Sequence, residues 1–323
     1  MFAPNKRYNT FSAYLKQKFG VKVYKITIDA GFSCPNRDGT ISSGGCIFCD
    51  GSGSFSQAHS NLLSVEQQVE TGIKTLSERF GAEKFMSYFQ AYSNTYKPVK
   101  ELEKIYDSSL KNEKIIGISI GTRPDCVDDD KLKLISSYNQ NYETWIEYGL
   151  QSIHDKTLSR INRGHDYNCF LKAYERSKEF GLNVCVHVIL GLWETHDEIM
   201  QTAQELARLK VDGVKIHMLC AIKNTPLSKM YERGEIDFMS EEDYVKTVCD
   251  FLEYLPETTT IHRMAGNGLK KDLIAPRWLG KKFDTLNKID RELEQRGSYQ
   301  GNHFIYGESI LHPSSKVREV SNQ

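Results

Sequence analysis

The sequence predicts an α/β fold, a partial (β/α)6 barrel similar to part of a TIM barrel, with an α+β C-terminal extension. Strand-like and helix-like segments alternate six times between residues 23 and 219. The strand-like segments are continuous apolar runs, as expected for parallel strands buried on both faces of a sheet. Polar, glycine-rich segments follow nearly every strand. A barrel gathers all its strand ends around one site, whereas an open sheet has its site where the strand order reverses, so we favour the barrel.

Capping residues mark the boundaries of the expected helices. Ser64 with Gln67 and Thr195 with Glu198 form capping boxes, and Pro98 suits the first turn of a helix. The apolar runs between the helices have the length of strands. The expected strands span residues 23–28, 84–90, 114–120, 142–149, 182–190 and 213–219. The expected helices span residues 64–80, 98–110, 128–138, 154–162, 168–180 and 195–209.

The pattern of the chain changes after residue 235. We therefore divide it into a basic and aromatic N-terminal segment (1–22), a barrel core (23–235) and a C-terminal extension (236–323). In the extension, Ser240 caps a helix to residue 255, "TTTIHR" has the composition of a strand, and Gly297 ends a helix that begins at residue 283.

The overall charge says nothing about an anionic partner, because 42 basic and 42 acidic residues balance. The N-terminal residues are different: basic side chains alternate with aromatic ones, and no acidic residue precedes Asp29. Such a segment can bind nucleic acid by charge and stacking. An amphipathic helix packed by its aromatic side chains explains the same pattern more simply, and we favour it on the sequence alone.

The compartment follows from two features of the sequence. No hydrophobic run approaches ~20 residues, so we expect no membrane span. The N-terminus "MFAPNKRYNT" lacks the apolar region of a signal peptide, so we expect a cytoplasmic protein. Cysteines stay reduced in that compartment, and a tight cysteine cluster there indicates metal binding or catalysis rather than disulfides.

Three cysteines, Cys34, Cys46 and Cys49, lie in a polar stretch with the spacing C-x11-C-x2-C. Zinc prefers four tetrahedral ligands, and His59 would complete a Cys3His site. Alternatively, three thiolates hold a 4Fe–4S cluster and leave one iron open for an outside ligand. The cluster is favoured because the stretch directly follows the first strand, at the expected active-site end. Its many glycines also let backbone N–H groups approach sulfides and anions.

Several motifs, in order along the whole chain, resemble the radical S-adenosylmethionine (radical SAM) family. They are "DAGFSCPNRDGTISSGGCIFCD", "YFQAYSNTY", "IGTRPDCV", "EYGLQS", "NRGH", "GVKIH" and "LIAPRW". The first gap between cysteines is longer than in the common C-x3-C-x2-C spacing. Long gaps occur in the branch that includes the Elongator catalytic subunit and the YhcC/YtqA-type proteins, and the chain looks most like the latter.

The resemblance implies a cofactor, a cosubstrate and roles for individual residues. Cys34, Cys46 and Cys49 would bind a 4Fe–4S cluster whose open iron is chelated by SAM. The reduced cluster cleaves SAM to methionine and a 5′-deoxyadenosyl radical, which abstracts a hydrogen from the substrate. The resemblance further assigns the SAM ribose to Gln151 and the methionyl carboxylate to Arg163, whose guanidinium can bind it bidentately.

The remaining candidates have structural interpretations that compete with the functional ones. Ser93 and Asn94 would accept from the methionyl amine, or they form an ordinary polar turn. Thr122 is a further candidate for binding the cosubstrate. The residue before it, Gly121, stands where Elongator-type sequences have a Glu. His187 would reach the ribose, or it is a core histidine. Gly191 would let the chain approach the adenine.

Lys215 and His217 are the candidate catalytic residues. They alternate along the sixth strand with one residue between them, so both point to the same face, which in a barrel is the interior. We expect them to contact substrate or move protons, and bracing of a buried carboxylate is the alternative.

The resemblance also bears on the substrate and partners. The Elongator-like branch acts on the C5 position or side chain of the tRNA wobble uridine, so a tRNA substrate is expected, with basic residues of the extension available to phosphates. An electron donor such as flavodoxin or ferredoxin is implied. The alternatives are a small-molecule oxidoreductase like the coproporphyrinogen dehydrogenases and a non-enzymatic, zinc-stabilised RNA-binding protein.

Overall fold

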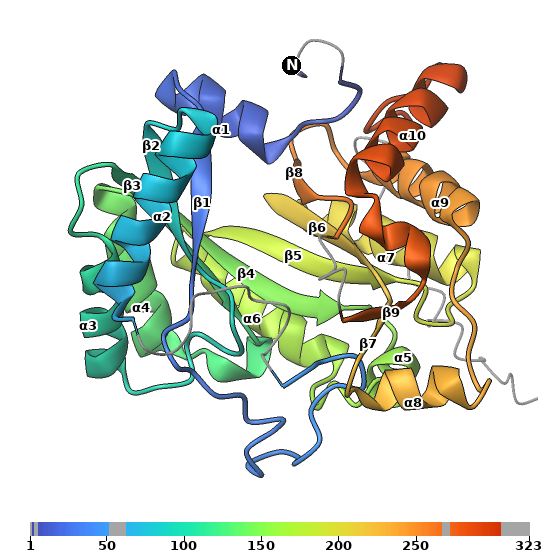
Figure 1. Ribbon diagram of the computed structural model, residues 1–323, viewed down its shortest axis with the longest axis horizontal. Coiled ribbons are helices and arrows are strands. Elements are labelled where there is room, and N and C mark those ends of the chain that lie inside the picture. The colour runs from blue at the N-terminus through green and yellow to red at the C-terminus, as the bar shows by residue number, and fades with distance from the viewer. Residues whose placement is uncertain (1, 3–5, 52–62, 267–271, 305–323) are drawn as a thin grey trace, which may run out of the picture.

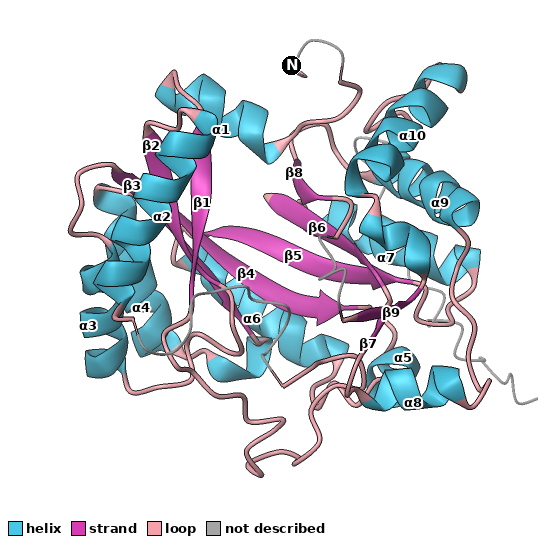
Figure 2. Ribbon diagram, in the orientation of Figure 1, coloured by secondary structure: helices cyan, strands magenta, loops and turns pink. Residues whose placement is uncertain are grey.

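One curved sheet of parallel strands forms the centre of the protein (Figures 1 and 2). The computed structural model describes residues 2, 6–51, 63–266 and 272–304. Within them, the strand order is β1-β2-β3-β4-β5-β6-β8, and every neighbouring pair is parallel. The strands are β1 (Val23–Ile28), β2 (Lys84–Phe89), β3 (Ile115–Thr122), β4 (Glu143–Gln151), β5 (Asn183–Leu190), β6 (Gly213–Met218) and β8 (Thr260–Arg263).

Helices follow the strands and cover the outer face of the curled sheet (Figure 2). The helices of this layer are α2 (Val65–Phe80), α3 (Val99–Ser109), α4 (Asp129–Ser137), α6 (Tyr167–Glu179), α7 (His196–Leu209) and α9 (Glu241–Tyr254). The short helices α5 (Asp155–Arg160) and α8 (Pro226–Glu232) lie at the carboxyl ends of the strands. The capping boxes at Ser64 and Thr195 are both formed, which confirms those two helix starts.

The main core lies between the sheet and these helices. Strand β4 is buried along almost its whole length, which explains why it reads as an apolar run rather than an alternation. The side chains of Phe85, Leu102, Ile118 and Leu206 show how strands and helices contribute together, since each is fully buried in one contiguous cluster. The predicted partial barrel with a C-terminal extension is thus confirmed.

The C-terminal extension contributes a strand to the barrel sheet itself. Strand β8, which lies in the expected "TTTIHR" segment, pairs in parallel with β6, so the sheet has seven strands. Helix α10 (Lys282–Gln295) packs beside α9. A second, two-stranded antiparallel sheet joins β7 (Ala221–Ile222) to β9 (Leu273–Ala275), and this pairing was not expected from the sequence. Its strands are too short to leave a periodic signal.

Helix α1 (Phe11–Phe19) closes the end of the barrel where the strands begin (Figure 1). Thr10 forms a parallel bridge with Ile261, so the segment joins the edge strand β8. Phe11 is buried, stacks on His262 at 3.7 Å between ring centroids, and meets Trp145 edge-on. The amphipathic helix favoured for this segment is therefore the structure that it adopts.

Among the described residues, no helix combines the length and the apolar composition that a membrane span requires.

Candidate active site

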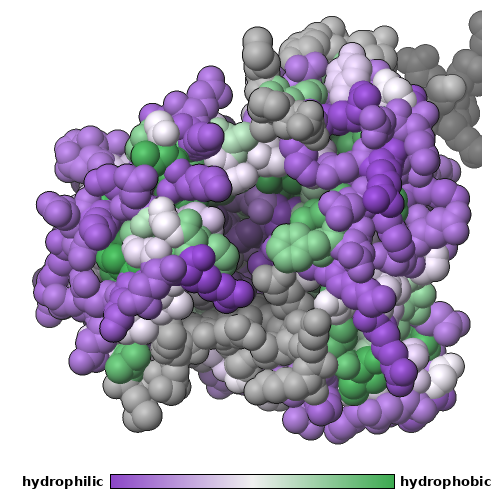
Figure 3. All heavy atoms as spheres, turned by 45° about the horizontal axis from the view of Figure 1, so that its top comes forward, coloured by the Kyte–Doolittle hydropathy of each residue, from purple (hydrophilic) through white to green (hydrophobic). Residues whose placement is uncertain are grey.

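A cavity of about 240 Å³ opens at the carboxyl ends of the strands. Its wall contains all three clustered cysteines, together with residues in or after the carboxyl-terminal halves of β2, β3, β4, β5 and β6. Figure 3 shows a hollow near the middle of one face, with hydrophilic residues at its bottom. The prediction that the polar strand ends converge on one site is met by these lining residues.

The cysteine loop, which we define as residues 34–49, is held by backbone hydrogen bonds to distant parts of the chain. Its Ile47 N–H donates to Ile161 O at 3.1 Å, and its Ile47 carbonyl accepts from Leu227 N–H at 3.0 Å. Inside the loop, Gly45 N–H donates to Asn36 O at 2.7 Å. Gly45 has φ 73°, and a Cβ there would meet Arg37 at 2.9 Å, so glycine is required.

The thiol groups have a spacing that suits a cluster better than a single metal ion. The three sulfur atoms do not all lie within 4.8 Å of one another. One tetrahedral zinc would bring its sulfur ligands closer than that, because each Zn–S bond is about 2.3 Å long. In a 4Fe–4S cluster each cysteine binds a different iron, which separates the sulfurs. His59, the fourth ligand of the zinc alternative, lies outside the described residues.

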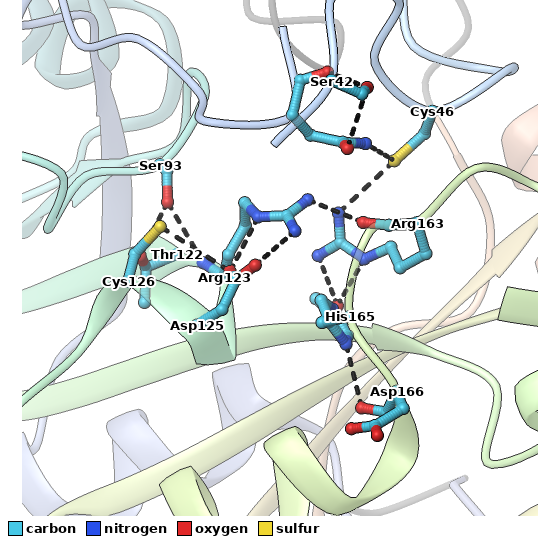
Figure 4. A network of polar contacts seen from close by, with 12 residues as sticks. Ser42, Cys46, Ser93, Thr122, Arg123, Asp125, Cys126, Arg163, His165 and Asp166 are labelled. Carbon is cyan, nitrogen blue, oxygen red and sulfur yellow. Dashed lines mark hydrogen bonds and ion pairs between the residues drawn. The ribbon is translucent and has the colours of Figure 1, made fainter. Parts of the chain in front are cut away.

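Arg163 is buried beside the cysteine loop (Figure 4). Its Nη1 lies 3.4 Å from Cys46 Sγ, and Nε and Nη2 both donate to Gly149 O. Asn36 Nδ2 approaches the same sulfur at 3.7 Å. Two N–H groups thus point at one sulfur, which is the kind of hydrogen bonding that the sulfur of a cluster ligand receives.

Gln151 lies at the end of β4, next to Arg163. A β-bulge between Gly149 and Gln151 precedes it, and its φ of 80° is a left-handed conformation that is strained for a residue with a Cβ. A Cβ on Gly149 would meet Gln151 Nε2 at 2.8 Å and Arg163 Nη2 at 2.7 Å. The glycine of "EYGLQS" therefore makes room for both side chains on the cavity wall.

An ion pair next to Arg163 stabilises this part of the cavity wall (Figure 4). Arg123 binds both carboxylate oxygens of Asp125, at 2.8 and 2.5 Å, and its Nη1 donates to Arg163 O at 2.9 Å. The pair thus fixes the backbone that carries Arg163.

Ser93 and Asn94 are fully buried in the loop after β2. Ser93 Oγ lies 3.1 Å from Thr122 Oγ1, and Asn94 Nδ2 donates to Gly121 O at 2.7 Å. Thr122 lines the cavity, whereas Ser93 and Asn94 are not among the described lining residues. From the end of β2, Gln90 and Tyr92 line the cavity instead. Asn94 Oδ1 has no hydrogen-bond partner among the described residues.

A buried carboxylate, Glu147, forms the floor of the cavity. Its Oε1 accepts from Lys25 at 2.6 Å and from Ser119 at 2.5 Å. Its Oε2 accepts from His187 Nε2 at 2.8 Å and from Lys215, which also donates to Tyr88 Oη at 2.8 Å. Glu147, Cys185 and His187 offer ligand atoms close enough for a metal ion, but the two ammonium groups already neutralise the carboxylate.

Burial and charge shift the pKa values of this floor. Burial raises the pKa of Glu147, but Lys215 and Lys25 outweigh it and hold this pKa well below its usual range. Burial, and next the charge of Lys215, lowers the pKa of His187 to about 4. Burial also lowers the pKa of Lys215 to about 8, although Glu147 opposes this. His187 is therefore neutral at pH 7, and Lys215 loses its proton closer to neutrality than an exposed lysine does.

The four candidates on strands β5 and β6 have different surroundings. His187 and His217 line the cavity, and their rings lie 5.4 Å apart. Lys215 is buried behind Tyr88, which lies between it and the cavity. Gly191 has φ 88°, and a Cβ there would meet Met218 at 3.3 Å. Lys215 and His217 do share the inner face, as their spacing predicted.

Sequence reasoning missed several residues on the cavity wall: Tyr88, Gln90, Glu147 and Arg263. A signal existed for Glu147, because a carboxylate inside the apolar run "YETWIEYGL" must have buried partners. Arg263 had no such signal, because its contribution depends on β8 joining the sheet.

Comparisons with known sequences agree with this arrangement. The profile of the radical SAM superfamily matches residues 37–206, and that of the Radical_SAM C-terminal domain matches residues 211–295. The uncharacterized protein YtqA of Bacillus subtilis is 42% identical over 300 residues, which are 93% of each chain. Protein YhcC of Escherichia coli is 37% identical, over 90% of this chain and 94% of its own. Human Elongator complex protein 3 is 28% identical over 53% of this chain and 30% of its own.

The fold has a solved counterpart as well. The archaeal Elp3 of Methanocaldococcus infernus, with an N-terminal deletion, superposes with a TM-score of 0.65 at 17% identity, over 86% of this chain and 64% of that one. This likeness concerns the fold alone. Together, the matching profile and the full-length relatives show that the chain is a YhcC-type member of the radical SAM superfamily, whose members use a 4Fe–4S cluster and S-adenosylmethionine.

Proposed function

We propose that this radical SAM enzyme cleaves SAM reductively and modifies the C5 side chain of the tRNA wobble uridine. The observation that carries the SAM part is the meeting of Cys34, Cys46 and Cys49 with Arg163 and Gln151 on one cavity wall. These residues come from three motifs that lie far apart in the sequence. The cluster, when bound and reduced, supplies the electron that cleaves SAM to a 5′-deoxyadenosyl radical.

The chain's own residues suit the cofactor and cosubstrate. Three thiols occupy a polar wall with N–H donors at Cys46, and their separation suits a cluster. Arg163 would bind the methionyl carboxylate of SAM, because its Nη1 points toward the cysteine loop while Gly149 O holds its other nitrogens. Gln151 would hydrogen-bond the ribose through its amide, which both donates and accepts.

The other cosubstrate contacts are weaker candidates. Asn94 Oδ1 lacks a partner among the described residues and is the kind of acceptor that an ammonium needs, and Ser93 stands beside it. Both side chains belong to the loop behind the wall, and Thr122 connects that loop to the cavity. We also propose that His187 contacts the SAM ribose and that Gly191 lets the chain approach the adenine.

Proton movement in the cavity falls to Lys215 and His217. Lys215 donates to Tyr88 Oη, and Tyr88 lines the cavity, so a proton can pass between the buried amine and a bound substrate. A pKa near the working pH is what a general acid or base requires, and burial lowers the pKa of Lys215 to about 8. His217 faces the cavity directly, with a buried Nε2 that has no hydrogen-bond partner among the described residues.

The tRNA substrate is supported by the motifs and by the relatives. The long first cysteine gap and "EYGLQS" resemble the Elongator-type branch, and human Elongator complex protein 3 aligns with half of the chain. An external electron donor is required by radical SAM enzymes, and we propose flavodoxin or ferredoxin for this role.

The first experiment tests the cluster and the cleavage of SAM. We expect the anaerobically reconstituted protein to contain iron and sulfide and to release 5′-deoxyadenosine from SAM under a strong reductant. Cys46→Ala removes one of three cluster ligands and should abolish both. Cys169→Ala is the control, because Cys169 is another free cysteine but lies half-buried on α6. Colourless protein with stoichiometric zinc would refute the proposal.

The second experiment tests the substrate. Nucleosides from the tRNA of cells with and without the gene are compared by mass spectrometry. We expect the gene's loss to change the wobble-uridine nucleosides, and a Cys46→Ala copy should fail to restore them where the Cys169→Ala copy succeeds. An unchanged wobble-uridine profile would contradict the tRNA substrate without touching the cleavage of SAM.

A further inference from the structure

Among the described residues, one cation on the cavity wall has neither a hydrogen-bond partner nor a counterion. Arg263, the last residue of β8, lines the cavity, and its guanidinium makes no hydrogen bond or ion pair with any described residue. This contrasts with Arg123, which pairs with Asp125, and Arg163, which binds Gly149 O. A partly buried charge without a partner is costly, so proteins keep such a charge where a ligand pairs with it.

A second unpartnered polar group lies beside Arg263. Arg263 is directly across from Lys215 in the pairing of β8 with β6, and His217 is two residues further along β6 on the same face. The buried Nε2 of His217 has no hydrogen-bond partner among the described residues. Burial, and next the charge of Arg263, holds the pKa of His217 well below its usual range. The neutral imidazole therefore adds a hydrogen-bonding group without a second charge.

The charges at this end of the cavity do not balance. Lys25, Lys215 and Arg263 are positive, and the only described carboxylate that contacts any of them is Glu147, which binds the two lysines. With both lysines protonated, two lysines and one carboxylate leave a net charge of +1, and Arg263 raises it to +2. A bound anion would reduce that excess, and a guanidinium binds carboxylate or phosphate through two parallel hydrogen bonds.

We propose that Arg263, with His217 next to it, forms a subsite for an oxyanion of the substrate, either a carboxylate or a phosphate. The subsite lies on β6 and β8, at the opposite edge of the sheet from β1 and the cysteine loop that follows it. It would anchor the acidic end of a substrate whose reacting end faces the SAM residues. The inference rests on the proposed function only in treating this cavity as the substrate site.

Binding to the full-length wild-type chain provides the first test. The probes are uridine, 5-carboxymethyluridine, its neutral amide 5-carbamoylmethyluridine, and uridine 5′-monophosphate, measured by isothermal titration calorimetry or ligand-observed NMR. We expect at least one acid to bind about 10-fold more tightly than its neutral counterpart, as a charged hydrogen bond provides. Preference for 5-carboxymethyluridine would place the anion on the base, and preference for the monophosphate would place it on the backbone. Equal binding of all four would overturn the proposal.

Substitution of the arginine provides the second test. Arg263→Gln should weaken binding of the preferred acid about 10- to 100-fold and leave the neutral probe unchanged. Arg263→Lys keeps the charge but loses the bidentate fork, so intermediate affinity is expected. Arg233→Gln is the matched control, because Arg233 pairs with Glu235 on the surface. Undiminished binding in Arg263→Gln, or equal loss in Arg233→Gln, would overturn the proposal.

These measurements separate the two proposals. They record binding rather than turnover, so a chain that failed to bind iron would refute the proposed function and still report on Arg263. If a variant fails to fold, as thermal unfolding will show, the comparison of charged and neutral probes on the wild type decides the matter alone.

Discussion

The two ends of the barrel differ in how particular cations are paired. At the closed end, Lys6 pairs with Asp290 and Lys18 pairs with Glu143. Tyr14 Oη also donates to Glu143, at 2.9 Å. At the open end, Arg263 and the Nε2 of His217 have no partner among the described residues.

The difference teaches that charge and aromatic content do not identify a site by themselves. The N-terminal segment has the composition of a nucleic-acid binder, yet Tyr8 and Phe11 are buried against the barrel and two of its lysines, Lys6 and Lys18, form ion pairs. The open end has an ordinary composition, but Arg263 and the Nε2 of His217 have no partner there among the described residues. Unsatisfied groups are costly and therefore indicate function better than composition does.

Glu147 connects the two ends and offers the largest test of this distinction. It binds Lys25 of β1 and Lys215 of β6 while fully buried. Glu147→Gln leaves both ammonium groups without a counterion, so we expect a loss of about 3–5 kcal/mol in the free energy of unfolding. Urea unfolding measures this loss. Glu242→Gln is the control, since Glu242 is exposed and pairs with Lys246 on the surface; equal losses in the two variants would contradict the prediction.

Phe11 tests the closed end alone. Its ring is buried between His262 and Trp145, and Lys25 Nζ lies 4.7 Å from its centroid. We expect Phe11→Ala to cost about 3 kcal/mol of unfolding free energy, because it opens a cavity in a packed cluster. The reconstituted iron content should not change. Phe283→Ala is the control, because that ring is 76% exposed. If Phe11→Ala lost iron while it remained fully folded, the closed end would not be independent of the cluster site, and the prediction would be wrong.

The pH dependence of stability tests the cavity floor around Glu147, which lies between the two ends of the barrel. Burial, with Lys215 as the next cause, lowers the pKa of His187 to about 4 in the folded state, against about 6.5 when unfolded. The unfolded chain therefore binds more protons between these values, so stability falls as the pH drops from 6.5 to 4. His187→Gln removes this uptake, and we expect it to lower the pH dependence over that window by about 2 kcal/mol. Equal slopes in wild type and variant would contradict the assignment.

Local signals predicted most of the elements. Capping boxes at Ser64 and Thr195 and apolar runs of strand length reproduce the helices and strands of the core, because these patterns act within a few residues. The pairing of β7 with β9 was missed, since two- and three-residue strands have no periodicity. The place of β8 in the main sheet was also missed, because register between distant strands leaves no trace in either strand alone.

In the candidate site too, local motifs predicted some of the lining residues correctly and others not. Motifs predicted that Cys34, Cys46, Cys49, Gln151 and Arg163 belong together, and all five line one cavity. Ser93 and Asn94 were read from the same kind of motif, but they lie behind the wall, because a turn motif does not specify which side chains face inward.

By itself, the sequence determined the parallel barrel, the cysteine loop and the family, because each is written in residues that lie close together or in ordered motifs. Only the tertiary structure decided that the basic N-terminal segment is a packed closure, that Glu147 joins Lys25 to Lys215, and that Arg263 has no counterion within the described parts of the chain. The physical reason is that pairing of charges depends on distances between strands far apart in the chain. Those distances are set by the curvature and register of the sheet.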